Sequence, residues 1–409
     1  MTLKHKIIYN TAVQFVGRFF TSFIGFITTI ILARYLGAAN YGVYAKIFTL
    51  ASFFYLFVDF GLNAVYIRRF QNDLKSLSQV FVLRAFLSLV SVVVILLFFW
   101  FFGSSVFSNQ EKLWAIILLP TILLFSFYTT FNIIFQLKLR YDLSVISSII
   151  GGLVGLLLLV RFLHYGILIA LIALVVGYLI TVLCAYFFSR RISASDLSFT
   201  LKLPFKLETG LLKQALPLGT MLFLNTIYSR IDVFVISAYV NNQAVGVYQL
   251  AYKFFEFPLA FALFFSNSIF PHYVKTYQQN VVHFWQIFKK STFYLLLSSI
   301  VFMVAGYLLA GYLNLIKPEY ASSAAPLRIL VLSYPVFFAT SALSWLIFVL
   351  KKEKSLILVY GVSFIINITA NILLVPRYSF IASSWITVIG EVLVLLALVI
   401  VLLPKKTPR

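Results

Sequence analysis

The residues most able to do chemistry are four cations in long apolar stretches: Arg18, Lys46, Arg230 and Lys253. A charged side chain within a lipid bilayer costs several kcal/mol unless it faces water or a partner. Four cations that converge on one cavity would attract a multiply charged anion, such as a diphosphate, through charge-assisted hydrogen bonds. The residue types therefore predict an anion-binding site.

Uncharged polar side chains share helix faces with some of these cations. Gln14 precedes Arg18 by four residues and Gln249 precedes Lys253 by four, a spacing that places both members on one face. A polar face on an apolar helix suits a cavity, although a hydrogen-bonded seam between helices is the alternative. We expect the polar lining to include Gln14, Asn225, Gln249 and Asn367.

Three carboxylates in apolar stretches are candidates for ion coupling: Asp232, Glu256 and Glu391. Glu391 lies in the middle of its stretch, where desolvation favours the neutral acid and suits proton exchange. Lys253 and Glu256 can touch at i, i+3, whereas Arg230 and Asp232 are two residues apart and point away from each other. The spacing of Lys253 and Glu256 fits a neutralised structural pair as well as it fits direct ligand contact.

Further charged residues lie nearer the ends of apolar stretches or between them. Arg84 and Arg328 can extend to the membrane interface, which is called snorkelling. Asp59 lies about 20 Å along its helix from Lys46 at 1.5 Å per residue, so these two cannot form a local ion pair. We expect Asp59 to anchor an inner loop and Glu111 to be isolated in an outer loop.

Long apolar stretches fill the chain and must carry these groups. Of its 409 residues, 62% are hydrophobic and 11% are charged, which is typical of a polytopic membrane protein. Each stretch has about 20 residues or more, enough to cross the ~30 Å hydrocarbon layer as an α-helix. We predict an all-α membrane protein with about twelve transmembrane helices, near residues 11–33, 43–63, 80–102, 113–136, 143–163, 166–188, 213–238, 245–270, 291–314, 326–350, 355–375 and 378–403.

Basic residues predict the orientation of these helices. They concentrate at alternate connections, whereas the opposite connections hold only Arg34, Lys112, Arg161, Lys317 and Arg377. The positive-inside rule then places both termini in the cytoplasm. The apolar run near the N-terminus is too long for the core of a signal peptide, so we interpret it as a retained first helix.

The two halves of the chain resemble each other. Gly42-Val43-Tyr44 opens the second predicted helix, and Gly246-Val247-Tyr248 opens the eighth. The sequence IFQLK ends the fourth helix and IFVLK ends the tenth. Similar motifs at matching positions predict two parallel six-helix repeats around a central cavity. We divide the chain into an N-terminal bundle, 1–188, a cytoplasmic connector, 189–212, and a C-terminal bundle, 213–409.

Several classes of function lack their usual residues. The net charge of +21 is spread over helix ends and forms no continuous basic patch with aromatic platforms, which argues against a nucleic-acid partner. The single cysteine, Cys184, and four scattered histidines provide no recognisable metal site. No glycine-rich phosphate loop follows a strand, so we expect no ATP hydrolysis, no cofactor and no enzyme activity.

The run LARYLGAANYGVY, from Leu32 to Tyr44, followed by Asp59-Phe60-Gly61-Leu62, resembles the opening of Wzx-type polysaccharide flippases. These belong to the MOP superfamily, which includes the multidrug MATE exporters and the lipid II flippase. The resemblance implies a V-shaped, MATE-like protein that moves undecaprenyl-diphosphate-linked oligosaccharides to the outer leaflet by alternating access, for O-antigen, capsule or exopolysaccharide assembly. The lumenal basic residues that would hold the diphosphate and sugar match Arg18, Lys46, Arg230 and Lys253.

Two other functions stay open beside the flippase. A MATE-type exporter of cationic drugs would favour acidic residues in its cavity, and Asp232, Glu256 and Glu391 are compatible with that. A membrane-embedded glycan polymerase or glycosyltransferase would need a larger outer loop with catalytic groups over its active site. The resemblance also implies the bacterial inner membrane as the location, with the lipid bilayer, a polysaccharide polymerase and a chain-length regulator as partners.

Overall fold

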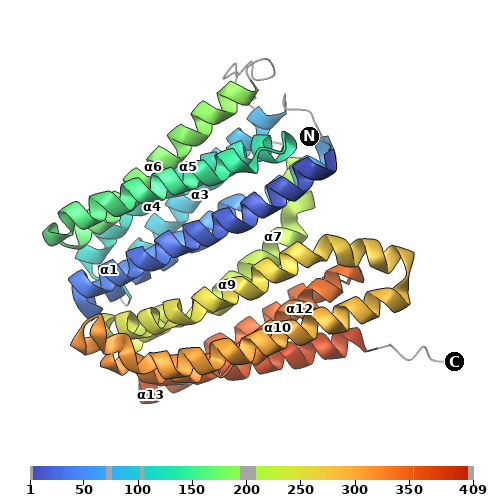
Figure 1. Cartoon of the computed structure of the whole chain (residues 1–409). Coiled ribbons are helices and arrows are strands. Elements are labelled where there is room, and N and C mark those ends of the chain that lie inside the picture. The colour runs from blue at the N-terminus through green and yellow to red at the C-terminus, as the bar shows by residue number, and fades with distance from the viewer. Residues whose placement is uncertain (1–2, 71–75, 102–105, 194–208, 353, 404–409) are drawn as a thin grey trace. The chain divides into compact units, whose positions relative to one another are not determined.

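The computed structural model describes residues 3–70, 76–101, 106–193, 209–352 and 354–403, which are almost entirely helical and contain no strand (Figure 1). The predicted all-α fold is thereby confirmed. The predicted connector, 189–212, lies mostly outside the described residues.

The chain forms two compact units. Unit 1 comprises Met1–Leu36 and Val43–Phe223, and unit 2 comprises Gly37–Gly42 and Leu224–Arg409. A short segment from the N-terminal half of the chain is therefore part of unit 2. The boundary near residue 224 falls within a helix.

Long helices build both units. Those of unit 1 are α1 (Leu3–Asp59) apart from Gly37–Gly42, α2 (Leu62–Phe70), α3 (Leu77–Phe101), α4 (Asn109–Leu137), α5 (Tyr141–Phe162), η1 (Leu163–Tyr165), α6 (Ile167–Ile192) and most of α7 (Thr209–Arg230). Those of unit 2 are α8 (Asp232–Tyr239), α9 (Asn242–Gln279), α10 (Val281–Leu309), η2 (Ala310–Leu315), η3 (Pro318–Ser323), α11 (Ala324–Val331), α12 (Tyr334–Val349) and α13 (Lys354–Leu402).

The first half of α1 runs parallel to α5. A Cβ atom on Gly152 would lie 3.4 Å from Ile24, and a Cβ atom on Gly17 would overlap the side chain of Val145. Residue numbers therefore rise together along the two helices.

The second half of α1 runs parallel to α4, because Lys46 contacts Glu111 and Tyr55 contacts Thr121. Hydrogen bonds between α4 and α5 show that these two helices are antiparallel. The two halves of α1 must therefore also be antiparallel. The reversal falls at Gly37, whose φ of 74° is readily adopted only by glycine.

Helix α13 is a second hairpin of this kind. Its backbone reverses at Ser379, which has φ 54°. On either side, Ser383 donates to Oδ1 of Asn371 at 2.7 Å, and Nζ of Lys352 donates to the carbonyl of Val401 at 3.1 Å. The two arms are therefore paired from the bend to their far ends.

The described residues contain nine helices long and apolar enough to cross a membrane, or ten if Pro318–Val331 and Tyr334–Val349 form one bent span. Two of these, Val16–Phe70 and Lys354–Leu402, contain the reversals just described and are far longer than the ~20 residues that one crossing needs. Dividing each at its reversal gives eleven crossings among the described residues, or the twelve predicted from the sequence when the bent pair counts as one span.

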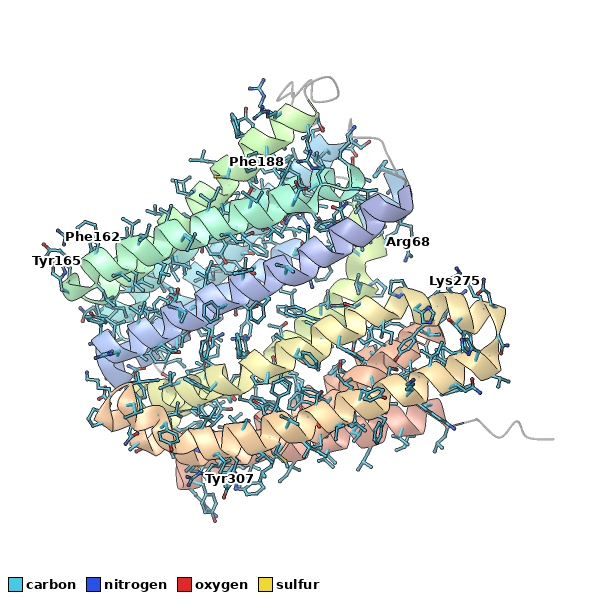
Figure 2. All side chains as sticks on the ribbon, in the orientation of Figure 1. Arg68, Phe162, Tyr165, Phe188, Lys275 and Tyr307 are labelled. Atoms are coloured by element: carbon cyan, nitrogen blue, oxygen red, sulfur yellow. The ribbon has the colours of Figure 1, made fainter. Side chains whose placement is uncertain are left out.

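Large apolar side chains cover the outside of each unit (Figure 2). Leu157 in unit 1 and Ile365 in unit 2 are both well exposed. Such a surface is an aggregation hazard in water but is stable against lipid. Within unit 1, Phe162 and Tyr165 lie at one end of the α5–α6 hairpin and Phe188 lies near the other (Figure 2). The protein is a multi-pass membrane protein.

The glycines of the two Gly-Val-Tyr motifs, Gly42 and Gly246, meet inside unit 2. A Cβ atom on Gly42 would overlap the carbonyl oxygen of Asn242, and one on Gly246 would overlap the carbonyl oxygen of Ala38. Each carbonyl belongs to the residue four positions before the other glycine, so two helix starts cross in a nearly symmetric way. Glu319 accepts a hydrogen bond from the Ala38 backbone N–H at 2.8 Å and fixes this crossing further.

Candidate functional site

Two basic side chains and one carboxylate meet in unit 2, where α7 ends beside α9. Nη2 of Arg230, the last residue of α7, donates to Oε1 of Glu256 at 2.6 Å. Nζ of Lys253 donates to Oε2 of the same carboxylate at 2.8 Å. Each carboxylate oxygen therefore holds one cation. We call these three residues the cation cluster, which carries an excess of one positive charge.

The cation cluster is accessible from the surface of unit 2. The side chains of Arg230, Lys253 and Glu256 are 21%, 28% and 26% exposed. A hydrogen bond of 3.0 Å from the Tyr252 hydroxyl to the carbonyl of Ser229 ties α9 to the end of α7 and positions the cluster. Arginine has five N–H donors and lysine has three, so both retain donors for the oxygens of a bound anion.

The neighbouring acid, Asp232, belongs to a different contact. Its carboxylate accepts hydrogen bonds from the Tyr248 hydroxyl and from the backbone N–H of Val233, the latter at 2.9 Å. Asp232 is buried, whereas Arg230 turns to Glu256. The two residues thus bind separate partners, as their two-residue spacing predicts.

The other polar residues expected along the cavity lie at different depths in unit 2. Asn225 is half-buried on α7, whereas Gln249 and Asn367 are buried. Nδ2 of Asn371 donates to Oδ1 of Asn367 at 3.0 Å, so this amide pair stabilises the first arm of α13. Glu391 is buried on the second arm.

The predicted site residues of unit 1 are also divided between surface and interior. Arg18 is exposed and Gln14 is half-buried, both on the first half of α1. Lys46, on the second half of α1, is fully buried. Of the four predicted cations, the described structure brings Arg230 and Lys253 together, through Glu256.

Lys46 has a full set of partners inside unit 1. Its Nζ donates to Glu111 Oε2 at 3.0 Å and to the carbonyl of Val106 at 2.8 Å, and it lies 4.7 Å from the centre of the Phe107 ring. The side chains of Lys46 and Glu111 are 1% and 6% exposed. This pair therefore stabilises the contact between α1 and the start of α4.

The expectation that Glu111 is isolated in a loop is wrong. Glu111 also accepts a hydrogen bond from the backbone N–H of Ser108, while the Ser108 hydroxyl accepts from the backbone N–H of Glu111. This capping box satisfies N–H groups that a helix start otherwise leaves unpaired. The spacing Ser-x-x-Glu was the sequence signal that could have revealed it.

Replacing Lys46 with methionine is expected to reduce the free energy of unfolding by about 3–5 kcal/mol, because Glu111 would remain buried without its cation. The measurement is thermal unfolding of the purified protein in detergent. Replacing Lys112, a half-buried lysine of the same helix, with methionine is the control and should change stability by less than about 0.5 kcal/mol. Equal stability of the two variants would show that Lys46 is not held by Glu111.

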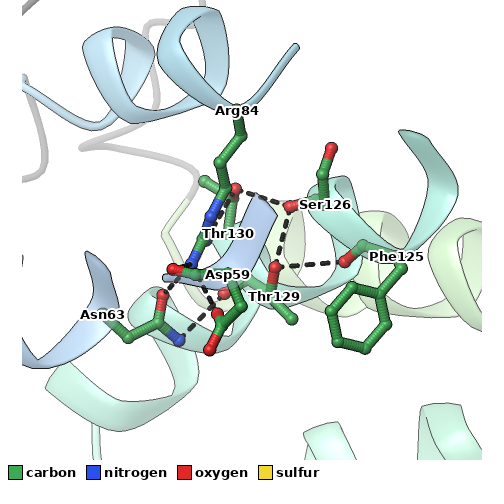
Figure 3. A network of polar contacts seen from close by, with 7 residues as sticks. All are labelled: Asp59, Asn63, Arg84, Phe125, Ser126, Thr129 and Thr130. Carbon is green, nitrogen blue, oxygen red and sulfur yellow. Dashed lines mark hydrogen bonds and ion pairs between the residues drawn. The ribbon is translucent and has the colours of Figure 1, made fainter. Parts of the chain in front are cut away.

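A second buried cation of unit 1, Arg84 on α3, is at the centre of a polar network (Figure 3). Its Nη2 donates to Oδ1 of Asp59 and to Oδ1 of Asn63, both at 2.8 Å, and its Nη1 donates to the Thr130 hydroxyl at 3.0 Å. Nδ2 of Asn63 donates to the carbonyl of Thr129 at 3.1 Å. The network therefore joins α1, α2, α3 and α4.

The expected snorkelling of Arg84 is wrong, because its side chain is fully buried. Asp59 is its ionic partner at the break between α1 and α2, so its contacts extend beyond an inner loop. Arg328 differs from Arg84: it is exposed, and its guanidinium lies 5.3 Å from the centre of the Tyr307 ring.

The sequence matches a family model described as polysaccharide biosynthesis protein over residues 7–277, well over half of the chain. The chain belongs to the polysaccharide biosynthesis protein family. The match includes all three residues of the cation cluster. No curated protein matches the chain by sequence.

Solved structures of transporters share the fold of this family member. The lipid II flippase MurJ, in an inward closed conformation, is 18% identical, with a TM-score of 0.75 over 96% of this chain and 87% of that one. An inward-facing MATE family multidrug resistance transporter of the MOP superfamily is 15% identical, with a TM-score of 0.75 over 93% and 92%. A Vibrio cholerae MATE transporter is 13% identical, with a TM-score of 0.67 over 97% and 95%. The predicted polysaccharide-related family is confirmed by the family model, and the predicted MATE-like fold is confirmed by the structural neighbours.

Proposed function

We propose that this protein is a flippase that moves undecaprenyl-diphosphate-linked oligosaccharides across the bacterial cytoplasmic membrane by alternating access. The product would serve O-antigen, capsule or exopolysaccharide assembly. The observation that carries the proposal is the partly exposed cation cluster in a member of the polysaccharide biosynthesis protein family.

The chemistry of the cluster suits the head group of such a lipid. Arg230 can donate two parallel hydrogen bonds to phosphoryl oxygens, and Lys253 adds a compact positive charge beside it. A glycan cannot cross hydrocarbon unaided, because its hydroxyls would lose their hydrogen bonds. Polar side chains such as Asn225 replace some of those partners, while the polyprenyl tail stays in lipid.

The remaining predicted residues take different places in the proposal. Arg18, exposed on α1, adds a further positive charge for the substrate. Lys46 would reach a substrate only by leaving Glu111, so we assign it to the structure of unit 1. Asp232 and Glu391 are proposed to couple transport to an ion. The termini are proposed to be cytoplasmic, and a polymerase and a chain-length regulator are proposed partners.

Export of cationic drugs is the alternative with the same fold, because MATE transporters are among the structural neighbours. A cationic drug requires accessible acids. In unit 2 the acids Asp232 and Glu391 are buried, and the partly exposed acid Glu256 is paired with two cations, Arg230 and Lys253, so the cation cluster keeps a net positive charge. The accessible charge in unit 2 therefore favours an anionic substrate.

The test follows the sidedness of undecaprenyl-diphosphate-oligosaccharide in cells depleted of this protein. Wild type should restore delivery to the outer leaflet. Arg230→Ala or Lys253→Ala, at equal expression, should lower the rate by about 10- to 100-fold, the value of one charge-assisted contact. Each variant is also checked for normal unfolding temperature, because both residues touch Glu256.

Lys275→Ala provides the matched control, since Lys275 is an exposed lysine on the same helix as Lys253 (Figure 2). It should restore transport fully. Full rescue by Arg230→Ala and Lys253→Ala would remove the cation cluster from the substrate site. Unchanged sidedness together with altered efflux of cationic drugs would favour the exporter.

A further inference from the structure

The Glu256 carboxylate holds its two cations in the way a bound phosphate would. Its two oxygens are bonded to one carbon atom, as phosphate oxygens are bonded to one phosphorus. Each oxygen accepts a hydrogen bond from a different cation, Arg230 at 2.6 Å and Lys253 at 2.8 Å. We infer, on the basis of the proposed function, that Glu256 is a built-in competitor of the substrate for the two cations. It occupies Arg230 and Lys253 when no substrate is bound, and the substrate's diphosphate displaces it.

Displacement is feasible because the cluster is partly exposed. All three side chains have between 21% and 28% of their surface exposed, so Glu256 can be hydrated when it leaves. Water that reaches these side chains also screens the attraction between Glu256 and its two cations. Glu256 lies one helical turn from Lys253, and a tethered group competes at an effective concentration in the millimolar range.

The buried lysine–glutamate pair of unit 1 differs from this cluster in both respects. Lys46 and Glu111 are almost completely buried, and Glu111 also binds the backbone of Ser108. Leaving that pair would strand a buried charge and open a helix cap. Glu256 makes both of its described ion pairs with cations that an incoming anion also needs.

The competitor gives selectivity by charge. A singly charged phosphate that displaces Glu256 replaces one negative charge by another, so the two cations gain little. A diphosphate brings at least two negative charges to the two cations and gains attraction. Bilayer phospholipids such as phosphatidylglycerol carry one phosphodiester charge and are abundant around the protein. Glu256 therefore excludes these lipids while admitting a diphosphate lipid, a case of specificity by disfavouring the wrong ligand.

The test measures binding of three lipids to the full-length protein in detergent: geranylgeranyl diphosphate, geranylgeranyl monophosphate and phosphatidylglycerol. Wild type should bind the diphosphate at least about tenfold more tightly than the other two. Glu256→Gln and Glu256→Ala should tighten binding of the singly charged lipids by about tenfold and reduce that preference. Asp142→Asn is the control, because Asp142 pairs with Arg140 on the surface of unit 1, and it should preserve the preference.

The outcomes separate this inference from the proposed function. If wild type shows no preference for the diphosphate, that measurement alone contradicts the inference. If Arg230→Ala abolishes diphosphate binding but Glu256→Gln leaves the preference intact, the inference fails while the anion site stands. If diphosphate binding survives both Arg230→Ala and Lys253→Ala, the anion site fails as well.

Discussion

Alanine at Gly42 or at Gly246 is expected to destabilise the protein by about 1–3 kcal/mol, although alanine is the better helix former. The added methyl group would overlap the carbonyl of Asn242 or of Ala38. A side chain could rotate away, but these obstacles are backbone atoms of a neighbouring helix. The two helix starts would have to separate, and the Glu319 contact with Ala38 would lengthen.

The measurement is the thermal unfolding midpoint in detergent, with Gly25→Ala as the control. A Cβ atom on Gly25 would meet nothing within 4 Å, so alanine there should be neutral or stabilising by up to about 1 kcal/mol. If Gly42→Ala behaved like Gly25→Ala, the helices would not cross as closely as described.

The double variant makes the test sharper. Gly42 and Gly246 face the same crossing from its two sides, so separating the helices for one methyl group also makes room for the other. The double variant should therefore cost less than the sum of the single variants. Strict additivity would mean that the two glycines act at independent places.

The helices could be predicted because hydropathy and length determine them. The first two predicted spans, ending at residue 33 and starting at 43, enclose the reversal at Gly37, and those ending at 375 and starting at 378 lie at the bend near Ser379. The repeat of Gly-Val-Tyr was also visible. The close helix crossing at these motifs could not be predicted, because the sequence does not show that Gly42 packs against the helix of Gly246 and Gly246 against the helix of Gly42.

Charged partners could be predicted only within one helix. Lys253 and Glu256 are three residues apart, and their expected contact is confirmed. Arg230 reaches the same carboxylate from another helix, which depends on how α7 and α9 align. Arg84 was expected at the membrane interface because it lies near the end of a span. Its burial instead depends on hydrogen-bond acceptors that α1, α2 and α4 supply. Such partners are determined by the packing of helices against one another, which a hydropathy pattern does not predict.

The Arg84 network leads to the second large expected effect, and the effect should be asymmetric. Asp59→Leu is expected to reduce the free energy of unfolding by about 3–5 kcal/mol, because it leaves a fully buried guanidinium without a counter-charge. Arg84→Met should cost less, since the Asp59 side chain is 28% exposed and water can hydrate it. The exposure of the charged residue that remains, rather than the size of the side chain that is removed, therefore decides which variant loses more stability.

The double variant Asp59→Leu with Arg84→Met tests this explanation. It removes both charges, so it should be more stable than Asp59→Leu alone, as replacing a buried ion pair by apolar groups is often neutral. Arg68→Met, at an exposed arginine of α2, is the control and should stay within about 0.5 kcal/mol of wild type. If Arg84→Met proved the more damaging single change, the acceptors on Asn63 and Thr130, rather than the charge of Asp59, would dominate the network.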